Sequence, residues 1–150
     1  MKRITFILGV AAAALALPAQ ANAQKATMKI HLKTGGKVLT ATLPDTPTSR
    51  DFLSLLPLKL RLKDYARTEK ISDLPRRLSI KDAPAGHTPV IGDLAYYAPW
   101  GNLAIFYQGA SHAPGLIKLG QLDGGIEHLA AMNGEFEVEL LRADAKQPIK

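Results

Sequence analysis

The sequence predicts a mainly β protein that folds as a closed or nearly closed β-barrel capped by two short helices. Three observations lead to this fold class. Short segments in which apolar and polar residues alternate recur along the chain, which is the period of half-buried strands. Two short stretches have apolar residues at helical spacing. Strand patterns do not alternate with long helical patterns, as they would in a parallel α/β fold, so a capped antiparallel barrel fits best.

The first residues have the three parts of a secretory signal peptide. Met-Lys-Arg precedes an apolar run over Ile4–Leu17, and Ala21-Asn22-Ala23 supplies an A-x-A cleavage site. The run is shorter than the roughly 20 residues of a membrane-spanning helix, although a retained anchor is the alternative interpretation. We predict a signal peptide over residues 1–23 and a single mature domain over 24–150 without a membrane span.

Composition restricts the compartment and the partners. The chain has no cysteine, and export without cysteine favours the bacterial periplasm, with secretion as the alternative. The net charge is +6, and Lys25–Asp82 carries thirteen Lys or Arg against six Asp or Glu, whereas Ala83–Lys150 carries four against seven. A basic half can indicate nucleic acid, but export and the missing motif argue against it. We expect a monomer that binds a small molecule or a peptide.

The first half of the domain has three predicted strands. Met28–Lys33 alternates strictly, Gly35-Gly36 supplies the positive φ angles of a tight hairpin, and Val38–Leu43 returns as the second strand. Leu58–Lys63 alternates in the same way. The following segment, Asp64–Ala85, is predicted as a loop with short pieces of strand or helix, and it is either a functional loop or a solvated connection.

Two short helices are predicted from spacing and capping. Thr48 is the expected N-cap of the first helix, and Pro57 ends it. Its apolar face comprises Phe52, Leu55 and Leu56. The second helix ends before Gly134, and its apolar positions are Leu122, Ile126, Leu129 and Ala130.

The last predicted strand, Glu135–Leu140, has three glutamates on one face. Such a row is stable beside a row of opposite charge, because each cross-strand pair contributes roughly 0.2–1 kcal/mol. Lys29, His31 and Lys33 form a matching row. We therefore predict that the first and last strands are neighbours and close the sheet. The competing row is Lys59, Arg61 and Lys63.

Aromatic residues concentrate in Gly92–Gly120, which holds five of the eight that follow the signal peptide. This stretch predicts strands at Tyr96–Ala98 and Leu103–Tyr107 around a turn, and a third at Leu116–Leu119. The aromatic rings either fill the barrel or present flat faces to a ligand at its mouth. Trp100 is the strongest candidate for a binding residue because it lies in the turn, where burial is not automatic.

The segment GDLAYYAPWGNLAIFY, over residues 92–107, resembles the bacterial cyclophilin-like domain family. Glu69-Lys70-Ile71 precedes it and Gly115–Gly120 follows it in the expected order, so the resemblance covers about Met28 to Arg142. The resemblance implies a cyclophilin-type barrel of about eight strands with two helices. It does not imply a reaction, because fold and function are separable.

The catalytic signature of the true cyclophilins is missing. Those prolyl isomerases use an arginine in a Phe-x-Arg setting, and no phenylalanine here is followed by arginine at that spacing. The glutamine-glycine-glycine-aspartate segment is reduced to Gly92-Asp93. Whether the chain is an enzyme is therefore open, and a divergent peptidyl-prolyl isomerase of envelope proteins is the alternative function. We assign no catalytic residue.

Other chemistry has little support. The four histidines are far apart and form no H-E-x-x-H pair, Ser111 lacks the G-x-S-x-G setting of a hydrolase, and no phosphate loop occurs. We expect no metal and no cofactor. The leading interpretation is an exported barrel that binds a small ligand or an extended peptide through an aromatic and basic groove. The predicted binding residues are Tyr65, Arg67, Glu69, Tyr97, Trp100 and Tyr107.

Overall fold

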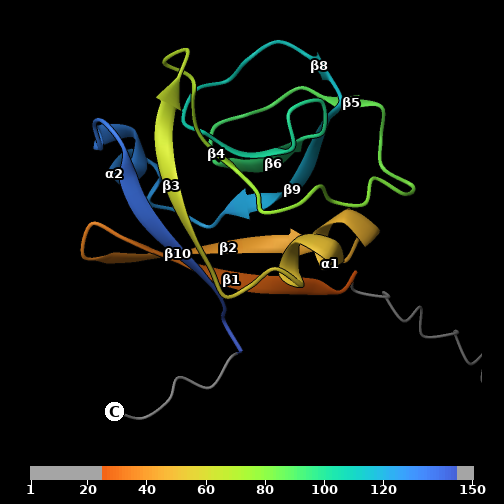
Figure 1. Ribbon diagram of the computed structural model, residues 1–150, viewed down its shortest axis with the longest axis horizontal. Coiled ribbons are helices and arrows are strands. Elements are labelled where there is room, and N and C mark those ends of the chain that lie inside the picture. Colours follow the sequence, from red (N-terminus) through yellow and green to blue (C-terminus); the bar gives the residue numbers. More distant parts are fainter. Residues whose placement is uncertain (1–24, 145–150) are drawn as a thin grey trace, which may run out of the picture.

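Eight antiparallel strands form a closed barrel in the computed structural model, which describes residues 25–144 (Figure 1). The predicted barrel is therefore confirmed. The predicted signal peptide lies outside the described residues. Around the barrel the strands are β1 (Thr27–Thr34), β10 (Phe136–Arg142), β3 (Leu58–Tyr65), β4 (Glu69–Asp73), β7 (Asn102–Phe106), β6 (Asp93–Tyr97), β9 (Leu116–Leu122) and β2 (Lys37–Pro44).

Four shorter elements accompany the barrel strands in the part of the chain that the structure describes. Helix α1 covers Pro47–Leu53, helix α2 covers Ile126–Ala131, and β5 (Gly86–His87) pairs with β8 (Ala113–Pro114) as a separate ribbon. Neither helix is long and apolar enough to cross a membrane. The ribbon lies beside the barrel near β6 and β9 (Figure 1).

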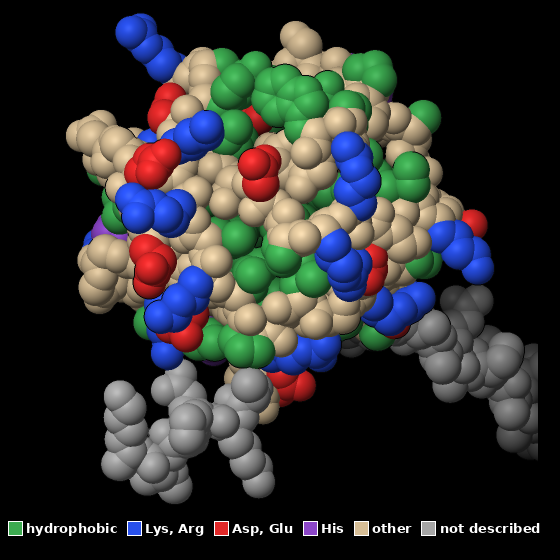
Figure 2. All heavy atoms as spheres, in the orientation of Figure 1, with side chains coloured by type: hydrophobic (Ala, Val, Ile, Leu, Met, Phe, Trp, Pro, Cys, Tyr) green, Lys and Arg blue, Asp and Glu red, His purple; other side chains and the backbone are tan. Residues whose placement is uncertain are grey.

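Strand β10 closes the barrel between β1 and β3. The predicted neighbourhood of the first and last strands is confirmed, since Lys33 is opposite Glu139. The competing basic row also flanks β10, and it forms the ion pairs: Arg61 lies 3.4 Å from Glu135, and Lys59 lies 3.8 Å from Glu137. Basic and acidic side chains accordingly alternate over this side of the molecule (Figure 2). Exposed pairs of this kind contribute about 0–1 kcal/mol each.

The first hairpin forms as its sequence predicts. Thr34 pairs with Lys37, so Gly35 and Gly36 alone make the turn, with φ angles of 53° and 74°. Two consecutive positive φ angles are the geometry of the turn that matches strand twist, and glycine adopts them without strain.

The start of α1 differs from the sequence prediction. Thr46, and not Thr48, is the N-cap, and its hydroxyl accepts a hydrogen bond of 3.1 Å from the backbone N–H of Ser49. The physical reason is Pro47, whose fixed φ and missing N–H suit the first helical position. Thr48 lies inside the helix and is buried.

The second helix also begins later than predicted. Leu122 is the last residue of β9, where it pairs with Ala41, and its buried side chain belongs to the barrel interior. Leu122 is apolar because it occupies an inward-facing position of the strand. Only Ile126–Ala131 is helical. Within α2, Leu129 is the buried residue.

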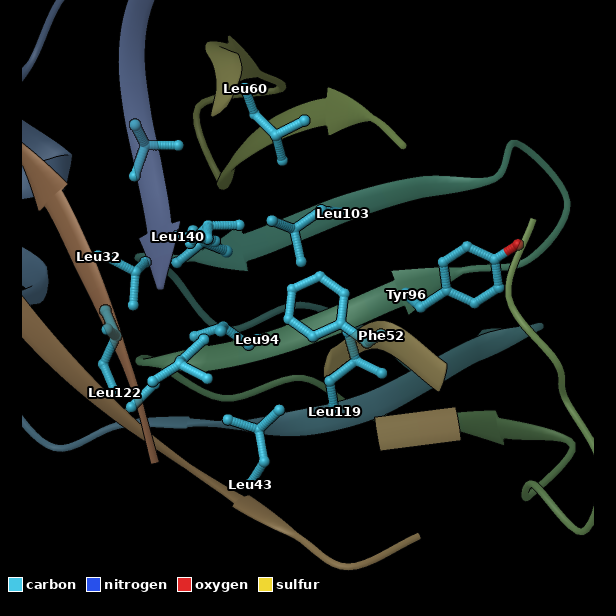
Figure 3. Packing of buried hydrophobic residues seen from close by; sticks show 14 of the residues in the cluster. Leu32, Leu43, Phe52, Leu60, Leu94, Tyr96, Leu103, Leu119, Leu122 and Leu140 are labelled. Atoms are coloured by element: carbon cyan, nitrogen blue, oxygen red, sulfur yellow. The ribbon is translucent and has the colours of Figure 1, made fainter. Parts of the chain in front are cut away.

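The barrel interior is filled by one cluster of buried apolar side chains, here called the inner cluster. Phe52 of α1 projects among strand residues and lies at the centre of this packing (Figure 3). The other labelled members are Leu32, Leu43, Leu60, Leu94, Tyr96, Leu103, Leu119, Leu122 and Leu140. Side chains alternate in and out along each barrel strand, which is why every second residue contributes.

The segment predicted as a loop, Asp64–Ala85, contains the barrel strand β4. The remainder is fixed to the barrel end. Leu78 is buried, and its N–H donates a 3.1 Å hydrogen bond to the Tyr96 hydroxyl. Arg76 pairs with Asp51 of α1 at 2.8 Å, and hydrogen bonds from Arg76 and from the Ser79 N–H lower the Asp51 pKa. These contacts hold residues 76–79 against one end of the barrel.

Candidate functional site

A second apolar cluster lies on the outside of the barrel wall. Its buried members are Ile71, Ala95, Ala104, Phe106 and Leu116, and the half-buried Tyr97 and Ala113 pack against them. These residues alternate along β6 and β7 with members of the inner cluster, so their side chains point outward. We call this group the outer cluster. An apolar patch outside a barrel must be covered by other parts of the chain or remain available for binding.

Two loop segments cover most of the outer cluster. Residues 86–91 and 107–115 are joined by the β5–β8 ribbon and by a 3.3 Å hydrogen bond from the Ala110 N–H to the Pro89 carbonyl. Gly115 donates to the carbonyl of Ala85 at 2.8 Å, which fixes the far end of the second segment. The cover ends near the β6–β7 turn, where Trp100 lies.

Trp100 is held in an exposed position by its turn. Its N–H and that of Gly101 both donate to the Tyr97 carbonyl, at 3.2 and 2.8 Å, and Gly101 has a φ of 73° that favours glycine. The side chain of Trp100 is 54% exposed. Its ring makes perpendicular contacts with Tyr65, at 5.4 Å and 88°, and with Tyr97, at 5.3 Å and 78°. Three aromatic side chains therefore meet at one point of the surface.

Tyr65 reaches this point because it ends β3. It is paired with Glu69, and the three residues between them make the turn. Ala66 and Arg67 both have a φ of 53°, which non-glycine residues adopt at some cost in energy. The Asp64 carboxylate accepts a 3.2 Å hydrogen bond from the Arg67 N–H and supports this conformation.

The three rings border an open pocket of about 200 Å³, here called the aromatic pocket. Phe106 and Leu116 of the outer cluster form part of its wall, and Glu69 is its one charged lining residue. Burial raises the pKa of Glu69. The lining consists of Tyr65, Glu69, Pro89, Tyr97, Trp100, Phe106, Ala110, Ser111, Ala113 and Leu116. Hydrophobic side chains also gather on the surface beyond the end of β3 (Figure 2).

A second hollow, of about 390 Å³, shares Tyr65 and Trp100 with the aromatic pocket. We call it the polar hollow because its other residues are mostly charged or polar. Its lining consists of Arg61, Lys63, Tyr65, Ile71, Ser72, Asp73, Trp100, Asn102 and Glu135. The Tyr65–Trp100 pair is thus a ridge between an apolar and a charged depression.

The structure brings together four of the six predicted binding residues, since Tyr65, Glu69, Tyr97 and Trp100 all line the aromatic pocket. Arg67 lines neither depression. The basic side chains of the site are Arg61 and Lys63 of the polar hollow. The aromatic and basic characters that the sequence suggested for one groove are therefore divided between two adjoining depressions.

Tyr107 lies elsewhere, because strand alternation turns its side chain away from that of Phe106. Its hydroxyl donates to Asp64. The buried Lys70 Nζ lies 3.1 Å from the same carboxylate and donates to the Met132 carbonyl at 2.7 Å. Burial and the hydrogen bond to Asp64 raise the pKa of Tyr107 to about 12. This group connects β3, β4 and the end of α2.

A fully buried aspartate supports the loop that walls the aromatic pocket. Asp93 accepts hydrogen bonds from His87 Nε2 at 2.7 Å and from the Val90 N–H at 3.0 Å, and it forms an ion pair with Lys118 at 2.8 Å. Burial raises the Asp93 pKa, but the bonds from His87, Lys118 and Val90 outweigh it, so the pKa lies below its ordinary value. These contacts fix the residues on either side of Pro89.

Sequence reasoning missed Asp93, His87 and Lys118 as partners. Their separation along the chain carries no motif, and Lys118 reaches Asp93 only through the strand pairing of β6 with β9. The sequence analysis also did not predict Phe106 as a pocket residue. Strand alternation could have indicated it, because Tyr97 is opposite Asn102 and every second residue after Asn102 lies on the same face of β7.

Comparison with known proteins supports the fold. Residues 32–141 match the model of the cyclophilin-like family. The solution structure of a hypothetical protein from Archaeoglobus fulgidus is similar, with a TM-score of 0.59 and 16% sequence identity over 81% of this chain and 99% of that chain. A search of curated proteins finds no significant match. From the barrel, its two helices and the match over most of its length, the chain belongs to the cyclophilin-like family.

Proposed function

We propose that this protein binds a small ligand or an extended peptide at the aromatic pocket. The observation that carries the proposal is the exposure of Trp100, which is 54% accessible while its ring contacts both Tyr65 and Tyr97 beside a concave surface. Single exposed apolar side chains are ordinary, but a contiguous group beside a pocket is typical of binding sites.

The two depressions suggest how each kind of ligand would lie. A small ligand would occupy the aromatic pocket, in contact with Trp100 and the outer cluster. An extended peptide would cross the Tyr65–Trp100 ridge, with one side chain in the aromatic pocket and the side chain two positions further along in the polar hollow beside Arg61 and Lys63. Side chains two positions apart along an extended strand point in the same direction, so such a crossing is geometrically simple.

Trp100 is the single tryptophan of the chain, so intrinsic fluorescence reports on this site alone. We expect a ligand to change the Trp100 emission, and calorimetry with Tyr65→Ala to show weaker binding of the same ligand. A screen of metabolites and peptides that leaves the emission unchanged would contradict the proposal. Val38→Ala is a suitable control, because Val38 is 58% exposed and lines neither depression.

A prolyl isomerase is the second candidate function. Arg61 lines the hollow on the far side of Trp100, which places a guanidinium beside an aromatic site although the Phe-x-Arg setting is missing. A donor of this kind can weaken the resonance of an X–Pro amide, whose rotation barrier is about 18–20 kcal/mol. A protease-coupled assay with proline peptides tests this directly. Catalysis that Arg61→Ala abolishes would support it, and a rate equal to the uncatalysed rate would exclude it.

We also propose that the domain works in the periplasm or outside the cell, because residues 1–23 have the pattern of a signal peptide. Expression of the full chain in a bacterium, followed by fractionation and N-terminal sequencing, tests this proposal. We expect the exported protein to begin at Gln24. Recovery of the intact N-terminus in the cytoplasm would contradict it.

A further inference from the structure

The aromatic pocket has the geometry of a cage rather than of a flat stacking platform. The Trp100 ring stands at 88° to Tyr65 and at 78° to Tyr97, and all three side chains line the same pocket. Rings at right angles form adjacent walls. A planar ligand such as a nucleobase stacks best on one face or between parallel faces, whereas a compact, rounded group contacts several walls at once.

The charge of the pocket selects for a cation. Glu69 is the one charged residue among the ten that line it, and none of the ion pairs among residues 25–144 includes Glu69. The basic side chains Arg61 and Lys63 line the polar hollow instead, Arg67 lines neither depression, and Lys70 pairs with Asp64. An anionic ligand would be repelled by this carboxylate. A cation would relieve the cost of burial that raises the Glu69 pKa.

The aromatic and apolar character of most of the lining favours an alkylated cation over a bare ammonium. A primary ammonium carries three N–H donors, and each needs an acceptor when it is buried. Four of the ten lining side chains carry acceptor oxygens, those of Tyr65, Glu69, Tyr97 and Ser111, and the other six offer an ammonium only apolar or aromatic surface. An ammonium whose hydrogens are replaced by methyl groups needs no such acceptors, and its methyl groups pack against the rings while its charge is attracted to their faces.

We propose that the aromatic pocket binds a quaternary or highly alkylated ammonium group, with Tyr65, Tyr97 and Trp100 as the cage and Glu69 as the counter-charge. This inference rests on the proposed function and names its ligand class. It assigns a distinct role to Glu69, which supplies charge rather than shape. The ring faces supply attraction that a neutral ligand of the same shape would not receive.

The test compares choline with its neutral isostere 3,3-dimethylbutan-1-ol, in which carbon replaces the nitrogen. Calorimetry and Trp100 fluorescence are measured with both probes on the mature chain. We expect choline to bind about ten times more tightly than the isostere, because the two differ only in charge. Equal affinities, or tighter binding of the isostere, would overturn the inference.

Two carboxylate variants distinguish a specific contribution of Glu69 from a general effect of the negative charge of the protein. Glu69→Gln keeps the shape of the side chain and removes its charge, and it should weaken choline binding about tenfold without changing the affinity of the isostere. Glu127→Gln is the matched control on α2, where the side chain is exposed and lines neither depression, and it should have little effect. Equal losses in both variants, or no loss in Glu69→Gln, would overturn the assignment. Thermal unfolding checks that both variants fold.

Three further probes identify the source of the alkylated ammonium. They are free glycine betaine, a peptide that contains trimethyllysine, and phosphatidylcholine vesicles. Binding of any of them that is lost in Glu69→Gln supports the cage. If a neutral or anionic compound changes the Trp100 emission while every alkylated ammonium fails, the cage is wrong and the proposed binding function stands. If no compound of any class changes the emission, both fail.

Discussion

The inner and outer clusters share strands β6 and β7 and have opposite surroundings. Along β6, Leu94 and Tyr96 enter the barrel while Ala95 and Tyr97 face outward. The inner cluster is enclosed on all sides by strands and by Phe52 of α1. The outer cluster is covered by two loop segments and remains open at Trp100. One face of these strands therefore stabilises the fold, and the other face borders an open pocket beside Trp100.

The largest expected effect is on the inner side. Phe52→Ala should lower the free energy of unfolding by about 4 kcal/mol, because it removes a fully buried ring at the centre of the barrel and leaves a cavity. Chemical denaturation with urea measures this. A loss below about 1 kcal/mol would mean that the packing of the barrel interior does not depend on the Phe52 side chain of α1.

The next effect concerns the buried charge beneath the pocket wall. Asp93→Asn should lower the free energy of unfolding by about 2 kcal/mol at neutral pH, because it removes the charge of a buried carboxylate that accepts hydrogen bonds from His87 and the Val90 N–H and pairs with Lys118. The Asp93 pKa is lowered in the folded state, so the contribution is present above the ordinary pKa of about 3.9 and is lost as the pH falls through the lower folded value. The wild type and the variant should therefore converge only below about pH 4. A constant difference down to pH 2 would contradict this.

Tyr107 should show a smaller effect and a distinct titration. Tyr107→Phe removes the hydrogen bond to Asp64 and should cost about 1 kcal/mol. In the wild type, absorbance of tyrosinate should show one residue that ionises near pH 12 instead of 10.0. Its stabilising contribution is complete below the ordinary pKa and is lost as the pH rises through the folded value. Loss of the high-pH transition in Tyr107→Phe identifies the residue.

The smallest effect on stability should come from the binding side. Trp100→Ala should change the free energy of unfolding by less than about 0.5 kcal/mol, since more than half of the side chain is exposed. Binding measured by calorimetry should be lost. If Trp100→Ala destabilises the protein as much as Phe52→Ala does, the division between the two clusters is wrong.

Much of the barrel was predictable because its signals are local. Strict alternation fixes the face of each residue in β1 and β3, and complementary charges predicted that β10 lies beside β1. The failures occur where local signals compete. The N-cap of α1 is Thr46 rather than Thr48, because Pro47 occupies the first helical position. Leu122 has helical spacing from Ile126 and Leu129, but it is the last residue of strand β9.

The candidate site was predictable where it follows strand ends and turns. Tyr65, Tyr97 and Trp100 end strands or lie in a turn, so they converge at one edge. Tyr107 does not line the aromatic pocket, because its side chain points away from that of Phe106. Arg67 does not line it either, since it lies in the turn after β3. The partners of Asp93 required knowledge of which strands pair across the barrel, and no local pattern in this sequence carries that information.

The position of β10 has a consequence for the order of folding. This strand, which is the last barrel strand along the chain, fills the gap between two strands that precede it by about a hundred and by about seventy-five residues: Lys33 pairs with Glu139, and Leu62 with Phe136. Closure therefore waits until nearly the whole domain has left the ribosome, and pairings so distant in sequence form slowly. Until β10 is free to pair with both of its neighbours, the other seven strands have no route to a sealed barrel.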